Sequence, residues 1–341
     1  MAQHLLFHDF SKNLLKISEI GDTLERLNDA IDWEVFRKKL KKIRKNNTGS
    51  GGRPAFDEIV MLKALILQQL YELSDDQVEF QIRDRLSFMR FLGIQSFTEI
   101  PDCKTIWVFR EKLTEHHLVR KLFDLFLNKL EEQGYTAKKG HIIDAPIVIA
   151  PRQRNSREEN QQIKDGKIPE DWNKNPNKLA QKDTDARWLK KNGEKFFGYK
   201  NYFVVDVKNK LIRDYSVSTA SGHDSQAAPG LLSKIPKGDK IYGDSAYHSD
   251  KISDVIVRRK LIPKICSKGK RGTPLTPSQM KNNRMISRFR SRIKHVFGRM
   301  TQMGNICVRT IGSTRATTCI GLQNLVYLVF RGALNNMKGS G

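Results

Sequence analysis

The sequence predicts a two-part protein, with an all-helical region over residues 1–135 followed by an α/β domain over residues 136–338. Apolar residues recur at helical spacing in the first part. From residue 141 onward, runs rich in β-branched residues alternate with helical segments. The 341 residues suffice for two domains of ~100–200 residues each. Residues 339–341 read as the remnant of a linker and are left out of the predicted fold.

The first part is predicted as several short helices joined by short loops. Ser74-Asp75-Asp76-Gln77 has the pattern of an N-terminal capping box. Such a region suits a DNA-binding or dimerisation module, and it equally suits a purely structural helical cap. The predicted helices cover 36–43, 59–67, 78–88 and 102–113, with a flexible loop over 46–52.

The second part is predicted as three strands followed by alternating helices and strands. That order is typical of a ribonuclease-H-like layout, in which a sheet containing a hairpin is flanked by helices. The polar segment 152–195 interrupts it as an insertion longer than an ordinary loop. The predicted strands are 141–150, 199–207, 211–219, 240–243 and 262–266, and the predicted helices are 225–233, 250–260, a long one beginning at the Thr276-Pro277 cap, and a shorter one over 320–334.

The net charge of +24 indicates a polyanionic partner, with nucleic acid first and an anionic membrane second. Residues 255–341 carry 18 Lys and Arg and no Asp or Glu, which leaves only +6 for the rest of the chain. No run approaches the ~20 apolar residues of a spanning helix, and no secretory signal is visible. The four scattered cysteines lack zinc-ligand spacing and predict reduced thiols in a cytoplasmic protein.

Two aspartates are candidates for metal-assisted chemistry. Asp144 is the only charge inside an apolar strand, where a lone carboxylate is costly unless it is paired or liganded. Asp244 directly follows the predicted strand 240–243, at the edge where an α/β sheet forms its binding crevice. If the two strands are neighbours, the carboxylates meet and can hold Mg²⁺ for phosphodiester chemistry. Either aspartate alone would more simply be a capping or ion-paired residue.

Ordered sequence blocks along nearly the whole chain resemble bacterial DDE transposases of the insertion-sequence-five family. The blocks are 53–54, 61–65, 83–88, 101–102, 109–113, 143–145, 183–188, 198–200, 223–225, 243–247 and 290–298. The resemblance implies that Asp144 and Asp244 are the first two acids of a catalytic triad that binds two Mg²⁺ ions, with Mn²⁺ as a substitute. It also implies double-stranded DNA as partner, both terminal inverted repeats and target DNA, and a homodimer that works in the bacterial cytoplasm.

The third acid of the triad is missing. The family has a glutamate in the block that reads Arg-Ser-Arg-Ile-Lys-His-Val-Phe-Gly over residues 290–298, and Lys294 stands in its place. No acidic residue follows Asp254, so no later neighbour can substitute. An ammonium group at this position removes a metal ligand and adds a cation, which predicts a poor or inactive catalyst that still binds DNA.

The remaining candidate residues are basic side chains for DNA contact and two residues beside the active site. His223 and Asp224 precede a helix and either cap it or lie near the catalytic acids. The candidate DNA-binding residues are Arg53, Lys190, Lys191, Arg288, Arg290, Arg292 and Arg299.

Three functions fit these observations. The first is an insertion-sequence transposase that cleaves DNA and transfers strands. The second is a catalytically impaired or deliberately inactivated DNA-binding protein of the same fold, which Lys294 favours. The third, a ribonuclease-H-like nuclease that does not transpose, explains the two aspartates but not the ordered blocks.

Overall fold

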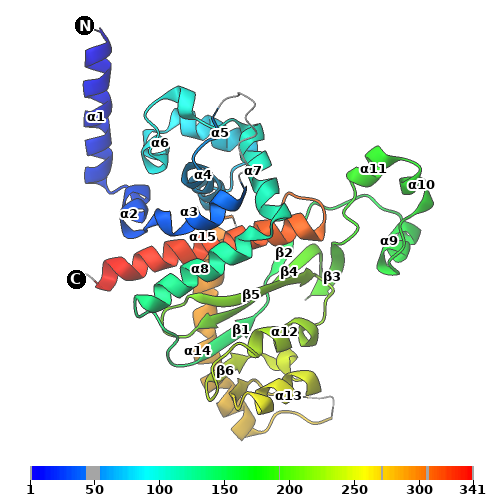
Figure 1. Ribbon diagram of the computed structural model, residues 1–341. Coiled ribbons are helices and arrows are strands. Elements are labelled where there is room, and N and C mark those ends of the chain that lie inside the picture. The colour runs from blue at the N-terminus through cyan, green and yellow to red at the C-terminus, as the bar shows by residue number, and fades with distance from the viewer. Residues whose placement is uncertain (1, 44–53, 192, 270–271, 305–306, 340–341) are drawn as a thin grey trace. The chain divides into compact units, whose positions relative to one another are not determined.

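The computed structural model describes residues 2–43, 54–191, 193–269, 272–304 and 307–339 (Figure 1). The chain divides into two compact units. The helical unit comprises Met1–Lys129 and Leu325–Gly341, and the sheet unit comprises Leu130–Asn324. The last residues of the chain, predicted as part of the α/β domain, are thus grouped with the helical unit. Gly339 ends the last helix, and the other two residues of the predicted linker remnant lie outside the described residues.

The helical unit is built from short helices whose ends carry the predicted caps. The capping box at Ser74 is present, with reciprocal bonds between Ser74 and Gln77. The predicted helix 78–88 is in fact two helices, because the chain becomes extended at Arg85. The predicted loop 46–52 lies outside the described residues. The elements are α1 (Ala2–Ile20), α2 (Thr23–Ala30), η1 (Trp33–Phe36), α3 (Arg37–Leu40), η2 (Lys41–Ile43), α4 (Glu58–Leu70), α5 (Asp75–Asp84), α6 (Leu86–Leu92), η3 (Phe97–Glu99), α7 (Cys103–Glu115) and α8 (Leu118–Glu132), whose last residues enter the sheet unit.

Helix α4 is the centre of the helical unit, because nearly all of its side chains are buried. It packs against α3, α5, α6 and α7. Lys63 of α4 is buried as well, at 8% exposure. Its ammonium group donates to Asn28 Oδ1 at 2.7 Å and to the Phe91 carbonyl at 3.0 Å, and it lies 5.2 Å from the centre of the Trp33 ring. A buried cation therefore ties α4 to α2 and α6.

The sheet unit contains a mixed sheet centred on one long strand, β4 (Figure 1). Strand β4 pairs antiparallel with β1, β2, β3 and β5, whereas β6 is parallel to both β1 and β7. The order across the main sheet is therefore β5-β4-β1-β6-β7. The strands are β1 (His141–Asp144), β2 (Ile147–Ile149), β3 (Arg187–Lys191), β4 (Glu194–Asp206), β5 (Ile212–Thr219), β6 (Lys240–Gly243) and β7 (Ile262–Ile265).

The predicted strand 141–150 is broken at Ala145-Pro146 into β1 and β2. Pro146 cannot donate to a ladder, and its carbonyl accepts instead from the N–H of Asn201. The insertion is less irregular than expected, since it contains α9 (Arg157–Lys164), α10 (Glu170–Asn173), α11 (Pro176–Ala180) and β3. Trp172 is fully buried in it and donates to Glu159 Oε1 at 2.8 Å.

Helices cover both faces of the sheet. On one face α12 (Asp224–Leu232) and α13 (Asp250–Arg258) form an apolar core with β-strand residues that include Val204 and Ile241. On the other face α14 (Pro277–Gln302) stacks Phe289 on Tyr242, and its Phe297 makes an edge contact with the ring of Phe203. Because adjacent strand residues point to opposite faces, these contacts place the sheet between two helical layers. Between β6 and α13 lies the short η4 (Ser245–Tyr247).

Helix α15 (Ser313–Gly339) corrects the prediction of a shorter final helix over 320–334. With 27 residues it is one residue longer than α14. Its start is anchored to the sheet unit, where Ala316 and Ile320 join an apolar cluster with β2 and β4. Asn324 and Asn201 of β4 exchange two amide hydrogen bonds, at 2.8 and 3.1 Å. None of the described helices is long and apolar enough to cross a membrane.

Because the ammonium group of Lys63 is buried, we expect the free energy of unfolding to change with pH in the alkaline range. Burial lowers the pKa of Lys63 from 10.5 to about 8. Between these values the unfolded chain binds more protons than the folded one, so the free energy of unfolding rises with pH. We expect it to rise by about 2 kcal/mol more in the wild type than in Lys63→Met between pH 8 and 10. Chemical denaturation at both pH values tests this, with exposed Lys38→Met as control. An equal rise in wild type and Lys63→Met would contradict it.

Candidate active site

The two candidate aspartates lie at the same edge of the sheet. Asp144 is the last residue of β1, and Asp244 directly follows β6. The two strands are parallel neighbours, with His141 opposite Ile241 and Ile142 opposite Tyr242. Continuing this register along both strands sets Asp144 opposite Asp244. Two carboxylates that are 100 residues apart in sequence are therefore neighbours in space.

Backbone hydrogen bonds orient both carboxylates. Asp144 Oδ1 accepts from the N–H of Ala145, and Asp244 Oδ1 accepts from the N–H of Ala246, each at 2.9 Å. The other oxygen of each aspartate, Oδ2, lies 3.7 Å from the same nitrogen, Nη2 of Arg290. The two Oδ2 atoms are thus no farther apart than twice 3.7 Å. One oxygen of each carboxylate is fixed by the chain, and the other faces a shared cation.

The Arg290 guanidinium is held mainly by charge. At 3.7 Å its nitrogen is farther from the carboxylates than in an ordinary N–H···O bond. Its Nε atom is buried without a hydrogen-bond partner among the described residues. The pKa of Asp144 is raised, chiefly by burial, although the Ala145 N–H and the charges of Arg290 and Lys191 oppose that rise. Asp244 adds to the rise in the pKa of Asp144 by repulsion, whereas a nearby cation favours the ionised form of Asp144.

The acid pair suits one divalent cation. Mg²⁺ is typically held by one or two carboxylates, with water and phosphate oxygens completing the octahedron. The two Oδ2 atoms already converge on a positive group, so they can serve as those ligands. Within the described ranges no group of three His, Cys, Asp or Glu side chains could hold a metal. The protein groups present fit one ion more readily than the two ions predicted for an intact triad.

Lys294 follows Arg290 by one helical turn on α14. Residues four apart lie on the same face of a helix, so the position predicted for the third acid is adjacent to the residue that contacts both aspartates. Lys294 itself is exposed. The ammonium group therefore has room to turn toward solvent.

The basic residues predicted to contact DNA occupy different environments. Arg288 is exposed on α14, whereas Arg292 donates to the Val207 carbonyl at 2.9 Å and Arg299 donates to Gln302 at 3.2 Å. Lys190 and Lys191 are exposed at the end of β3. Arg53 lies outside the described residues.

The two residues predicted to lie beside the active site are at the start of α12. His223 is exposed in the preceding turn, and Asp224 is the first residue of the helix. The turn is fixed because the Lys200 ammonium and the Tyr202 hydroxyl donate to the Gly222 carbonyl at 2.8 and 3.1 Å.

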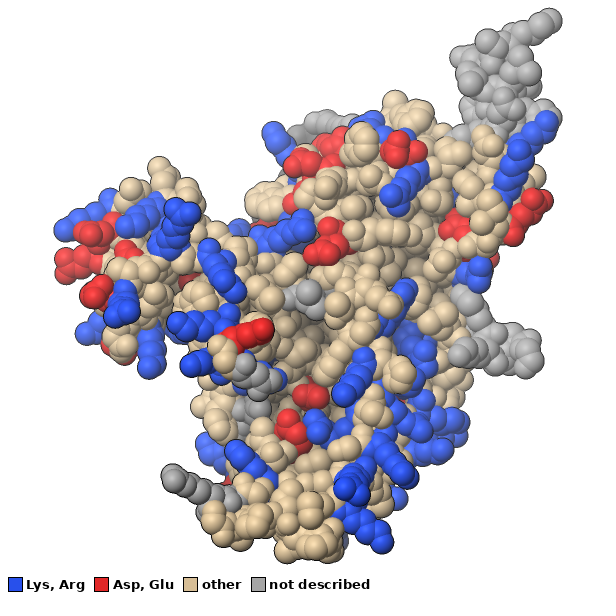
Figure 2. Space-filling view, turned by 180° about the vertical axis from the view of Figure 1, so that it is seen from behind, with Lys and Arg blue, Asp and Glu red and all other residues tan. Residues whose placement is uncertain are grey.

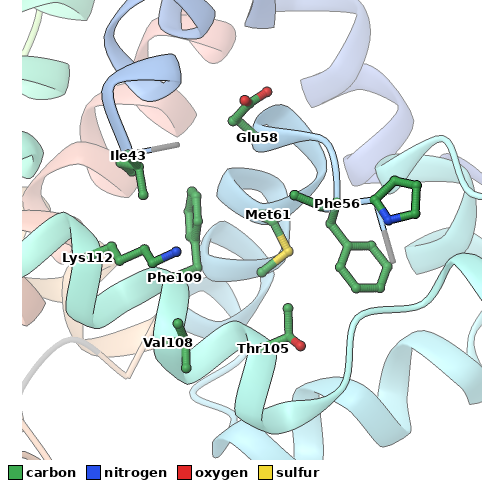
Figure 3. Close-up of a pocket in the computed structure, with 10 residues that line it drawn as sticks. Ile43, Phe56, Glu58, Met61, Thr105, Val108, Phe109 and Lys112 are labelled. Atoms are coloured by element: carbon green, nitrogen blue, oxygen red, sulfur yellow. The ribbon is translucent and has the colours of Figure 1, made fainter. Parts of the chain in front are cut away.

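Sequence reasoning missed that Arg290 lies against both acids and that the charge of Lys191 acts on Asp144. It also missed two cavities. One, of about 370 Å³, is lined by α9, β3 and β4 in the sheet unit. The other, of about 280 Å³, lies in the helical unit between the start of α4 and α7, with Met61 and Phe109 in its wall and Lys112 pointing toward it (Figure 3). The walls of the second cavity are mostly apolar and also contain Glu58 and Lys112.

An acid pair that converges on one cation position at the edge of a mixed sheet is typical of enzymes that use divalent metal ions on phosphodiesters. Residues 136–329 match the family described as "Transposase DDE domain", and residues 12–112 match the one described as "Transposase domain (DUF772)". The first match covers more than half of the chain, and the protein belongs to the transposase DDE domain family.

A relative and a solved structure also resemble the chain. The transposase for insertion sequence element IS1106 from Neisseria meningitidis serogroup B is 29% identical over 194 residues, which span 56% of this chain and 64% of that protein. A piggyBac transposase, solved by cryo-EM in a synaptic complex with hairpin DNA, matches 92% of this chain and 73% of its own. Its TM-score is 0.43 at 13% identity.

The contacts of Arg290 predict how the acid pair binds a divalent cation. The guanidinium competes with a metal ion for the same two Oδ2 atoms, so Arg290→Gln should bind Mn²⁺ at least about tenfold more tightly than the wild type. Titration calorimetry of Mn²⁺ into the metal-free protein measures this directly. Arg288→Gln, just over half a turn away on α14 and exposed, is the matched control and should bind like the wild type. Weaker Mn²⁺ binding by Arg290→Gln would show that the arginine supports the site instead.

Proposed function

We propose that the protein is the DNA transposase of an insertion sequence of the insertion-sequence-five kind. It binds terminal inverted repeats and catalyses metal-dependent cleavage and transfer of DNA strands. The observation that carries this proposal is the convergence of Asp144 and Asp244 on one cation position. The strand order β5-β4-β1-β6-β7, with only β4 antiparallel to β1, supports a ribonuclease-H-like catalytic domain.

Asp144 and Asp244 would hold the divalent cation, Mg²⁺ or Mn²⁺, through their Oδ2 atoms. When bound, such an ion stabilises the negative charge that develops on a phosphate under attack. The N–H groups of Ala145 and Ala246 keep both carboxylates turned toward the ion. Arg290 keeps the two like charges together before the ion binds, and it is then free to pair with a DNA phosphate.

The DNA would lie across the basic side of the sheet unit. Helix α14 has no acidic residue and exposes Lys281, Arg284 and Arg288. Figure 2 shows many Lys and Arg side chains on this view of the molecule, with acidic side chains in small groups among them. Lys190 and Lys191 add exposed positive charge from β3, and the charge of Lys191 favours the ionised form of Asp144. Homodimer formation and a cytoplasmic location remain predictions from the sequence.

Lys294 supports a second candidate function, a DNA-binding protein of this family with little or no catalytic activity. A divalent cation at this site has two carboxylate ligands from the protein, whereas an intact triad would give it three. Lys294, one helical turn from Arg290, also adds a positive charge near the cation. At an effective dielectric constant of ~20, a +1 charge about 4 Å from a +2 ion costs of the order of 8 kcal/mol before the side chain moves away.

The salt dependence of DNA binding tests the proposed DNA face. Each phosphate neutralised by the protein steepens the slope of log K against log salt by about 0.9. We therefore expect Arg288→Glu to flatten that slope by about one unit on a 30-base-pair duplex followed by fluorescence anisotropy. Lys237→Glu is the matched control, because Lys237 is exposed before β6 and hence at the opposite edge of the sheet from Asp244. Equal slopes for both variants would place the DNA elsewhere.

Restoring the third acid tests the catalytic proposal. Lys294→Glu should create or strongly increase Mg²⁺-dependent cleavage of DNA that carries the cognate ends, because it adds a carboxylate beside the acid pair and removes a cation. Cleavage is compared with and without chelator. Lys294→Gln, which only removes the charge, and Lys281→Glu, which adds an acid elsewhere on α14, are the controls. Equal chelator-sensitive cleavage by the wild type and Lys294→Glu would show that residue 294 is not at the metal.

A further inference from the structure

The cavity of about 370 Å³ in the sheet unit has the size and walls of a small-molecule site. Helix α9 forms one side of it, and β3 and β4 form the other. Ile163, Ala186 and Phe197 give it an apolar floor. Trp188 lines it as well and remains 40% exposed. An aromatic ring of this size is thus available to a ligand that enters the cavity.

The ring of Trp188 is held in a fixed place. Trp188 pairs with Phe197 in the β3–β4 ladder, and their ring centres are 5.2 Å apart. The guanidinium of Arg152 lies 6.0 Å from the Trp188 ring. A rigid aromatic side chain flanked by a cation is typical of surfaces on which nucleobases stack.

The mouth of the cavity is basic. Arg157 and Lys164, from the first and last turns of α9, are exposed and form no ion pair within the part of the chain that the structure describes. The third cation in the lining is Arg187. Its guanidinium already donates hydrogen bonds to carbonyl groups, including that of Ile163 at 3.0 Å. Two cations therefore remain for an anionic ligand group.

The buried acid in the cavity wall, Asp183, already accepts hydrogen bonds from other parts of the sheet unit. Asp183 accepts from the Tyr199 hydroxyl at 2.8 and 3.0 Å and from the N–H groups of Asp185 and Ala186. These four hydrogen bonds stabilise the charge of Asp183 and connect β4 to the insertion. The charge of a ligand is therefore determined by the basic residues at the mouth of the cavity.

Strand β4 connects this cavity with the acid pair. Phe197 in the cavity wall and Phe203, the sheet partner of Asp144, are six residues apart on β4. Six residues of a strand span at most ~20 Å, which equals about six nucleotides at the 3.4 Å spacing of B-form DNA. One DNA strand can therefore reach from the acid pair to the cavity.

We propose that this cavity binds one unstacked nucleotide, with its base against Trp188 and its phosphate at Arg157 and Lys164. The nucleotide belongs to the DNA strand on which the acid pair acts, so this inference rests on the proposed function. A free mononucleotide has the same chemistry, and the experiment separates the two sources.

The test compares two duplexes of 30 base pairs that differ at one position, an unpaired adenine in one and an abasic residue in the other. Anisotropy measures the affinity of the wild type, Trp188→Ala, Trp188→Phe and the double variant Arg157→Ala/Lys164→Ala for both. Trp107→Ala, an exposed tryptophan of the helical unit, is the matched control. Titration of dAMP in the absence of DNA, followed by tryptophan fluorescence, forms the second arm.

We expect the wild type and Trp107→Ala to bind the duplex with the unpaired base about tenfold more tightly than the abasic one. Trp188→Ala should lose this preference and Trp188→Phe should keep part of it, which separates loss of stacking from misfolding. The double variant should bind both duplexes more weakly.

A wild type that binds both duplexes tightly and equally would overturn the nucleotide site but not the proposed function. Failure to bind either duplex would overturn the proposed function itself. Binding of dAMP that requires Trp188, without any preference between the duplexes, would assign the cavity to free nucleotides and overturn the DNA strand as its source.

Discussion

The parallel pairing of β1 and β6 is the constraint on which the site depends. In register, it sets two carboxylates side by side at one sheet edge, where their repulsion must be offset by a cation. Arg290 supplies that cation from α14, and α14 in turn is seated by Phe289 on Tyr242 and Phe297 on Phe203. The apolar contacts of one helix thus fix the position of the charge that lets two acids coexist.

Local signals predicted most of the elements, including the strand that contains Asp144 and the strand that Asp244 follows. The caps at Ser74 and Thr276 act within four residues, and β6 was bounded correctly because turn residues flank it. The break at Pro146 was not predicted because it lies within a β-branched run. The hydrogen bond that satisfies the Pro146 carbonyl comes from Asn201, which is distant in sequence. The length of α15 was underestimated for a similar reason, since its start is stabilised by β2 and β4.

The arginines of α14 show what sequence cannot distinguish. Arg288, Arg290 and Arg292 are spaced alike and equally suited to DNA by composition. In the fold one is exposed, one lies on the acid pair and one is bound to the Val207 carbonyl. Their roles follow from the rotation of the helix against the sheet, which is set by packing. A count of basic residues therefore overestimates how many phosphates this helix can neutralise.

Gly198 is the residue at which the insertion is joined to the sheet. Ile149 of β2 and Arg187 of β3 pair with it from opposite sides of β4, and an added Cβ would lie 2.2 Å from the Val148 carbonyl oxygen. The chain thus leaves the sheet at β2 and returns to it at β3, two strands that flank β4 and lie ~10 Å apart. Such a closed junction lets the intervening segment lengthen, shorten or be exchanged during evolution without disturbing Asp144, provided that residue 198 stays glycine.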